Sequence, residues 1–223
     1  MTHMTREAIL TMFEEARYDE AINALLATDD TIFEKKEAYL LVGVAYYETD
    51  RYEYAKMFLE VAHQLDRDDA FIATMLAIVL DALGEDEDAL RLLRHSVSVD
   101  KTFVYAYVTM ADIDLKLGRF EEAMHYYYYA LRLLQSDEPL PKDCLPIAIR
   151  RLHWFEDKRL LFSMTANGLG TAYFEIGDRV HAKLWYAEAA LAKPLGTGFF
   201  DPYRNLMKVY QTDESTVKTI LSA

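Results

Sequence analysis

The sequence contains few of the residues that interrupt or cross-link a fold. Among its 223 residues are 8 glycines, 5 prolines and a single cysteine, Cys144. One cysteine excludes a disulfide within the chain. Scarce Gly and Pro, together with abundant Ala, Leu and Glu, favour helices over turn-rich β structure. We therefore predict an all-α protein that is long enough to bury a sizeable core.

Basic residues are also in short supply, with 24 Lys and Arg against 37 Asp and Glu and a formal net charge of −13. Nucleic acids and anionic membrane surfaces attract basic proteins, so neither is expected as a partner. The longest clean apolar run, AYLLVGVAYY (38–47), is well short of the roughly 18 residues that span a bilayer. The first ten residues lack the apolar core of a signal peptide. We expect a cytoplasmic protein with a protein partner.

Residues that could carry catalysis or bind a metal are not grouped in a usable pattern. None of the six histidines has metal-ligand spacing to a cysteine or to a second histidine, and His63, His95 and His125 are predicted to be surface residues. Cys144 and His153 could form a nucleophile pair, but nothing nearby would orient them. The sequence therefore predicts no metal, no cofactor and no enzymatic activity.

Five similar segments recur along the chain, each containing one alanine at the same place. These alanines are Ala21, Ala55, Ala89, Ala123 and Ala182, separated by three steps of 34 residues and one step of 59. A fixed period of this length is typical of a solenoid of stacked helix pairs. Small residues such as Gly43, Ala55 and Gly170 are expected at the seam, where they let the two helices of a pair approach closely.

This pattern resembles the tetratricopeptide repeat (TPR) family, whose 34-residue consensus places Trp, Leu, Gly and Tyr in a first helix and Ala and Phe in a second. In residues 36–69 the matching positions are Tyr39, Val42, Gly43, Tyr46, Ala55 and Leu59; in 163–196 they are Ala166, Leu169, Gly170, Tyr173, Ala182, Tyr186 and Pro194. Gly84, Gly118 and Gly177 stand at the expected turns between helices.

The resemblance implies a single TPR-type α-solenoid of antiparallel helix pairs over residues 1–223, with one inserted helical segment. The predicted parts are repeat units 2–35, 36–69, 70–103 and 104–137, an insertion at 138–162, a repeat unit at 163–196 and a partial or capping unit at 197–223.

Four consecutive tyrosines, 126–129, fan around one helix and cannot share a face. The repeat register predicts that Tyr126 and Tyr127 are packing residues. Tyr128 and Tyr129 are expected on the outer side or toward the next unit, where a helix of the insertion, containing Trp154, would pack on one of them. The alternative is that both face solvent.

The resemblance further implies that partners bind a concave groove lined by the first helices. The predicted groove residues are Leu40, Leu41, Val44, Tyr47, Phe71, Met75, Ile78, Tyr105, Val108, Asp112, Asn167 and Phe174. The row is mostly apolar with an acidic rim, so it suits a protein or peptide segment with apolar anchors and some Lys or Arg. It lacks the basic clamp with which some relatives bind acidic chaperone tails.

The leading hypothesis is therefore a non-enzymatic scaffold or adaptor. One alternative is a dedicated chaperone, similar to the TPR chaperones of bacterial type III secretion. A second is an enzyme or sensor with its site in the insertion. The apolar groove could also be filled by the insertion or the termini, or could be covered in a homodimer formed through an end repeat or another exposed apolar surface.

Overall fold

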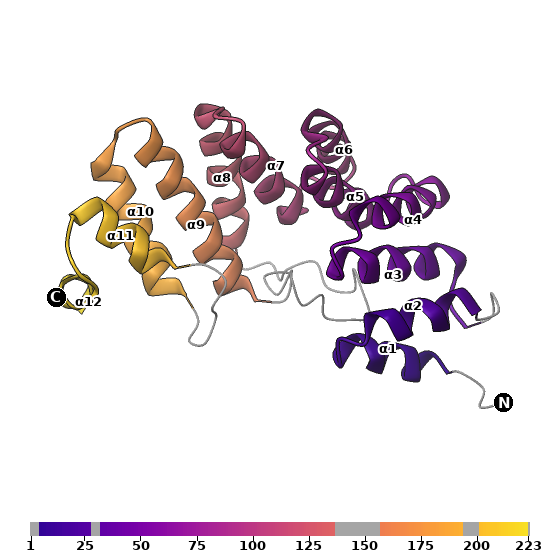
Figure 1. Ribbon diagram of the computed structural model, residues 1–223. Helices are drawn as coiled ribbons and strands as arrows, with labels where there is room; N and C mark the ends of the chain where they lie inside the picture. The colour runs from indigo at the N-terminus through magenta and orange to yellow at the C-terminus, as the bar shows by residue number, and fades with distance from the viewer. Residues whose placement is uncertain (1–4, 28–31, 137–156, 194–200, 223) are drawn as a thin grey trace. The chain divides into compact units, whose positions relative to one another are not determined.

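The computed structural model describes residues 5–27, 32–136, 157–193 and 201–222. These residues form twelve helices and no strand (Figure 1), which confirms the all-α prediction. The chain divides into two compact units, and among the described residues the division falls between Ala106 and Tyr107. We refer to them as the N-terminal and C-terminal units.

The N-terminal unit is built from helix pairs that follow one another along the chain. Its helices are α1 (Arg6–Glu14), α2 (Tyr18–Ala27), α3 (Lys35–Glu48), α4 (Tyr52–Leu65), α5 (Ala70–Ala82) and α6 (Asp86–Val99), followed by the first residues of α7 (Val104–Lys116). Helix α3 packs against α4, α4 against α5 and α5 against α6. Each helix therefore contacts its neighbours in sequence, as stacked repeats require.

The C-terminal unit holds most of α7 and the remaining helices. These are α8 (Phe120–Gln135), α9 (Lys158–Glu175), α10 (Arg179–Ala192), α11 (Pro202–Tyr210) and α12 (Glu214–Ser222). Helix α9 begins before residue 163, so the last residues of the predicted insertion belong to this helix. The insertion through residue 156, with Cys144, His153 and Trp154, lies outside the described residues. The division into repeat units stays a prediction.

The turns between paired helices share one backbone geometry. Each contains a residue with positive φ, and these residues are Ala16, Asp50, Gly84, Gly118, Gly177 and Gln211. Their spacing is the period of the alanines, with the partial C-terminal unit continuing it. In each turn the next residue's N–H donates to the carbonyl five residues earlier, over 2.7 to 3.2 Å. This Schellman-type closure reverses the chain and so produces antiparallel pairs.

Close helix approach at the seams follows from two glycines in the same register. A Cβ on Gly43 would stand 2.6 Å from Cγ of Leu59, and one on Gly170 would stand 2.7 Å from Cδ1 of Tyr186. Real Cβ atoms do not come this close, so an alanine at either position would force Leu59 or Tyr186 to shift. The predicted seam role of Gly43 and Gly170 is confirmed, and the five alanines that mark the period are fully buried.

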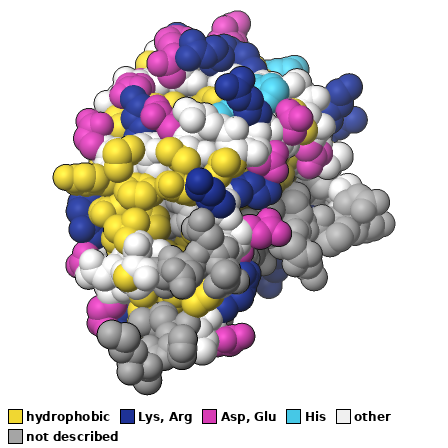
Figure 2. All heavy atoms as spheres, turned by 90° about the vertical axis from the view of Figure 1, so that its right-hand side faces the viewer, with side chains coloured by type: hydrophobic (Ala, Val, Ile, Leu, Met, Phe, Trp, Pro, Cys, Tyr) yellow, Lys and Arg dark blue, Asp and Glu magenta, His cyan; other side chains and the backbone are white. Residues whose placement is uncertain are grey.

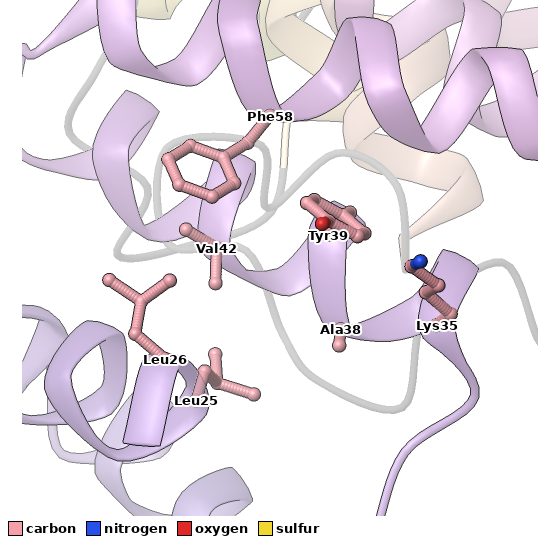
Figure 3. Close-up of a pocket in the computed structure, with 7 residues that line it drawn as sticks. All are labelled: Leu25, Leu26, Lys35, Ala38, Tyr39, Val42 and Phe58. Carbon is pink, nitrogen blue, oxygen red and sulfur yellow. The ribbon is translucent and has the colours of Figure 1, made fainter. Parts of the chain in front are cut away.

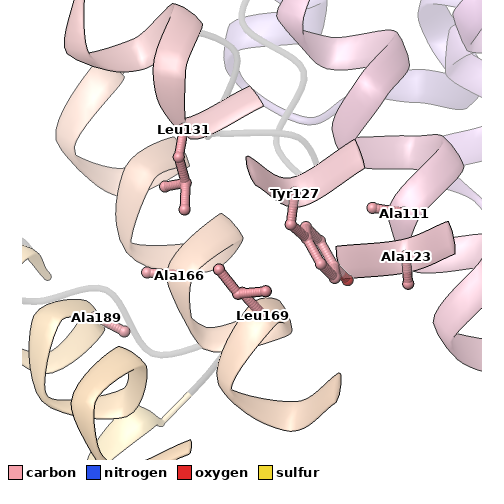
Figure 4. Close-up of a cluster of buried hydrophobic side chains, with 7 residues drawn as sticks. All are labelled: Ala111, Ala123, Tyr127, Leu131, Ala166, Leu169 and Ala189. Atoms are coloured by element: carbon pink, nitrogen blue, oxygen red, sulfur yellow. The ribbon is translucent and has the colours of Figure 1, made fainter. Parts of the chain in front are cut away.

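Tyr127 stands in the core of the C-terminal unit, as predicted, with no exposed surface. Its cluster joins residues of α7, α8, α9 and α10: Ala111, Ala123, Tyr127, Leu131, Ala166, Leu169 and Ala189. Figure 4 shows the Tyr127 ring between the two alanines of α7 and α8 on one side and Leu169 of α9 on the other. Small residues around a large ring let three helices meet in one layer.

The other three tyrosines pack within the same unit. Tyr126 is half-buried against the cluster. The Tyr129 ring centroid lies 4.4 Å from that of Tyr107. Tyr128 points toward the next helix pair, where its hydroxyl lies 2.8 Å from that of Tyr173 and its ring meets Trp185 edge-on. The expectation that the surplus tyrosines face the next unit is thus met by Tyr128, whereas the predicted contact with the inserted helix lies outside the described residues.

Candidate protein-interaction site

Most of the predicted groove residues are core residues. Eight of them are at most 9% exposed: Leu40, Leu41, Val44, Phe71, Met75, Ile78, Tyr105 and Val108. Tyr47 is half-buried, with its ring near that of Tyr52. A partner could touch the eight buried side chains only after whatever covers them had moved. Their role in partner binding stays a prediction.

The other three predicted residues lie in the C-terminal unit and are accessible. Asp112 on α7 is exposed, while Asn167 and Phe174 on α9 are half-buried. The hydroxyl of Tyr127 donates to Oδ1 of Asp112 over 2.5 Å and also lies against Gly168, next to Asn167. Tyr127 therefore brings α7 and α9 together at Asp112 and Asn167.

Burial, reinforced by the neighbouring Asp112, raises the pKa of Tyr127 well above its usual value. The phenol therefore keeps its proton at neutral pH and acts as a donor. The donated hydrogen bond holds Oδ1 of Asp112 at a fixed place on α7.

Helix α11 adds two residues that sequence reasoning missed. Nδ2 of Asn205 donates to Oδ1 of Asn167 over 2.8 Å. Nζ of Lys208 lies 4.4 Å from the centre of the Phe174 ring, a cation–π distance. No periodic signal could have found this pairing, because 38 residues separate Asn167 from Asn205.

We call this set of residues the α7/α9/α11 surface, and it consists of Asp112, Asn167, Thr171, Phe174, Asn205 and Lys208. Thr171 is held in it by the hydroxyl of Tyr186, which donates to its Oγ1 over 3.1 Å. The surface offers one carboxylate, two amides that can both donate and accept, a hydroxyl and an aromatic ring. Such a mixture can bind the backbone of an extended segment and one apolar side chain.

A second accessible feature is a pocket of about 190 Å³ in the N-terminal unit. Its lining comes from α2, α3 and α4: Leu25, Leu26, Lys35, Ala38, Tyr39, Val42 and Phe58. Figure 3 shows the two leucines of α2 and the Phe58 ring on either side of the α3 residues. In the space-filling view, hydrophobic side chains gather in a patch bordered by acidic and basic ones (Figure 2). The pocket has room for one or two apolar side chains.

His63 differs from the surface residue that the sequence suggested. It is half-buried on α4, and its Nδ1 atom is buried without a hydrogen-bond partner among the described residues. Burial lowers its pKa, with a further lowering from His95 and Arg67. His95, His125 and His181 are exposed.

In the described part of the chain, no group of three or more His, Cys, Asp or Glu side chains could hold a metal ion. No helix in the same residues has the length and apolar character needed to cross a membrane.

Antiparallel helix pairs with a shared turn geometry and glycine seams define an α-helical repeat protein. Residues 104–133 match the family model of the tetratricopeptide repeat. The prediction of TPR repeats is therefore confirmed. No curated protein matches the sequence.

Solved structures of TPR proteins share the fold. A structure of MamA (MSR-1) has a TM-score of 0.58 at 20% identity over 84% of this chain and 93% of that one. A second MamA structure has a TM-score of 0.62 at 16% identity over 82% and 92%. The C-terminal part of a TPR repeat-containing protein from Cytophaga hutchinsonii has a TM-score of 0.63 at 16% identity over 97% and 74%. At these identities the similarity is one of fold.

Proposed function

We propose that the protein is a non-enzymatic scaffold that binds a segment of another protein on the α7/α9/α11 surface. The observation that carries the proposal is the junction of Asp112, Tyr127 and Asn167, where a buried phenol fixes an exposed carboxylate beside an accessible amide. This preorganisation lowers the entropy lost when a partner binds. The TPR match supports the scaffold class, since solenoid repeats present extended binding surfaces.

The chemistry of the surface defines the partner segment. Asp112 suits a Lys or Arg, the amides of Asn167 and Asn205 suit a peptide backbone, and the Phe174 ring suits an apolar side chain. Nζ of Lys208, next to Phe174, would donate to a carboxylate of the partner. A segment with a basic and an acidic residue on either side of an apolar anchor therefore fits best. Three residues of the groove predicted from sequence, Asp112, Asn167 and Phe174, belong to this surface.

The test starts from a library of random peptides displayed on phage and selected on the purified full-length chain. The proposal predicts enrichment of segments with an apolar anchor next to Lys or Arg. An enriched peptide is then titrated by calorimetry against the wild type and Asp112→Asn/Phe174→Ala. Asn keeps an acceptor for the Tyr127 hydroxyl while removing the charge, so the double variant should fold and bind at least about tenfold more weakly, the equivalent of 1.4 kcal/mol.

The matched control is Ile176→Ala, which shortens a side chain that is 48% exposed just beyond the end of α9. It should bind the peptide as the wild type does. Equal binding by the wild type and the double variant would contradict the proposed location. A selected peptide that instead loses affinity in Phe58→Ala would place the site at the α2/α3/α4 pocket.

Two other hypotheses stay predictions. A chaperone of a secreted or aggregation-prone client would use the same kind of surface. It differs from an adaptor because its client is unstable or insoluble in isolation, whereas the partner of an adaptor folds without it. An enzyme or sensor site in the insertion would rest on Cys144 and His153, which lie outside the described residues.

A further inference from the structure

The α2/α3/α4 pocket lies beside a pair of aromatic rings that recurs later in the chain. The ring centroids of Tyr39 and Phe58 are 6.0 Å apart. Two repeat steps of 34 residues further on, the same positions hold Tyr107 and Tyr126, whose centroids are 6.5 Å apart. The two ring pairs are therefore equivalent in the repeat register, and their surroundings can be compared.

A third ring packs on the later pair and is missing from the earlier one. The ring centroid of Tyr129 lies 4.4 Å from that of Tyr107, which is only 8% exposed. In the earlier repeat the position of Tyr129 is taken by Val61. Tyr39 is accordingly half-buried, and it lines the pocket. The chain's own later repeat thus shows that an aromatic side chain packs against such a ring pair.

The pocket has the size and the lining that one aromatic ring requires. Its volume is about 190 Å³, and an apolar cavity of roughly 150 Å³ holds one benzene molecule. Leu25, Val42 and Phe58 supply apolar walls (Figure 3). Leu26 also lines the pocket and is 55% exposed, so an incoming ring would remove apolar surface from water.

The charge of the pocket selects what accompanies the ring. Lys35 is the single charged residue among the seven that line the pocket, and it lies at the edge of the group (Figure 3). Its side chain is exposed and forms no hydrogen bond or ion pair within the described residues. The adjacent Lys36, in contrast, is paired with Asp66 over 2.8 Å. An unpaired ammonium at the edge of an apolar pocket is complementary to a carboxylate.

We propose that the α2/α3/α4 pocket binds an aromatic side chain of a protein partner, and that an Asp or Glu next to it in the partner pairs with Lys35. The partner's ring would pack on Tyr39 as the ring of Tyr129 packs on Tyr107. The pocket belongs to the N-terminal unit and shares no residue with the α7/α9/α11 surface, so either site can exist without the other.

Short peptides that differ at one residue test the proposal. Acetylated and amidated Gly-Gly-Glu-Trp-Gly-Gly is titrated into the full-length chain labelled with nitrogen-15, and NMR follows the backbone amides. Amides of residues 35–42 and 54–61 should shift. Replacing the Trp of the peptide by Ala should weaken binding at least about tenfold, because the anchor is lost. Replacing its Glu by Gln should weaken binding about threefold, the usual effect of an exposed ion pair.

Val61→Tyr is the sharpest variant, because its ring should lie on Tyr39 and fill the pocket from within the chain. It should bind the Glu-Trp peptide at least about tenfold more weakly, and circular dichroism verifies that it is folded. The matched control is His95→Tyr, at the same register position one repeat later, which should bind as the wild type does.

Lys35→Gln changes an exposed side chain and leaves the apolar walls intact, so it should fold. In this variant the Glu and Gln peptides should bind equally, as a double-mutant cycle requires if Lys35 pairs with the peptide's carboxylate. A threefold difference that persists would overturn the pairing.

Three other results would overturn the binding site itself. They are pocket amides that do not shift at any peptide concentration, equal binding of the Trp and Ala peptides, and equal binding by Val61→Tyr and the wild type. Asp112→Asn/Phe174→Ala should bind the Glu-Trp peptide as the wild type does. Failure of this pocket and failure of the α7/α9/α11 surface are therefore distinguishable.

Discussion

A Cβ atom on Gly168 would stand 2.5 Å from the hydroxyl oxygen of Tyr127. The phenol crosses from α8 to the α9 backbone at this point and continues to Asp112. The missing side chain at Gly168 is therefore what allows Tyr127 to reach the accessible surface of α7 and α9.

Gly168→Ala should destabilise the C-terminal unit by about 1–3 kcal/mol, because the added methyl group overpacks a rigid ring. Urea unfolding monitored by circular dichroism measures the loss. In the double variant Tyr127→Leu/Gly168→Ala the two effects should fall short of additivity, since leucine, which stands at the equivalent positions Leu59 and Leu93, makes room for the methyl group. Additive effects would mean that the two residues do not compete for the same space.

Ala16→Gly should stabilise the N-terminal unit by about 1 kcal/mol. Ala16 has a φ of 58°, a left-handed conformation that glycine adopts without strain. Thermal unfolding should show a higher midpoint. Ala8→Gly, inside α1, is the control with the opposite sign and should lower the midpoint by a similar amount. A lower midpoint for Ala16→Gly would show that the turn bears no strain.

Asp69→Ala should cost about 1–2 kcal/mol, because Asp69 caps α5 by accepting from the N–H groups of Phe71 and Ile72, both over 3.0 Å. Asp69 also forms an ion pair with Lys36, whose Nζ lies 3.3 Å from Oδ2. Denaturant unfolding gives the value. Asp68→Ala changes a neighbouring side chain that is 81% exposed and should have little effect. If both substitutions lowered the free energy of unfolding equally, the loss would come from the change in net charge and not from the helix cap.

Tyr128→Phe should lower the pKa of Tyr173. Burial first, and then the Tyr128 hydroxyl, raise this pKa to about 12, because the neutral phenol is buried and hydrogen-bonded. Removing the hydroxyl removes the second cause, so the pKa moves toward its usual value of 10.0. NMR of tyrosine labelled at Cζ follows the titration. Tyr54→Phe, at an exposed tyrosine of α4, should leave Tyr173 unchanged.

The stability of the N-terminal unit should fall as the solution is acidified below the ordinary histidine pKa of 6.5. The folded state has the lower pKa at His63, mainly because of burial, so the unfolded state binds the proton more readily. The loss of stability begins near pH 6.5 and levels off once the pH falls below the pKa of His63 in the folded state. Urea midpoints measured from neutral pH to about pH 5 should decline less in His63→Gln. His125→Gln, at an exposed histidine, serves as the control, and identical slopes in all three proteins would exclude His63 as the cause.

The sequence predicts the helix pairs well because a seam tolerates only small residues. Gly43, Gly170 and the five buried alanines are consequences of that limit, so their period is visible without a structure. The turns are less visible. Glycine marks three of the six, while Ala16, Asp50 and Gln211 adopt the same left-handed conformation because the packing of the flanking helices imposes it.

The candidate site was predictable only in part. The register identified Asp112, Asn167 and Phe174 as first-helix residues, but it could not show which first-helix residues remain accessible. The exposure of a side chain depends on all the helices that pack around it, which the repeat register does not give. Val44 and Met75, for example, have no exposed surface. Asn205 and Lys208 belong to the degenerate last unit, where the repeat pattern is too weak to assign a face.

The contact between Trp185 and Tyr128 gives the chain a built-in optical reporter. The sequence has two tryptophans, so Trp154→Phe would leave Trp185 as the sole indole, with its ring centre 5.6 Å from that of Tyr128. Its emission would then follow the separation of α8 from α10 during unfolding or partner binding without any attached label.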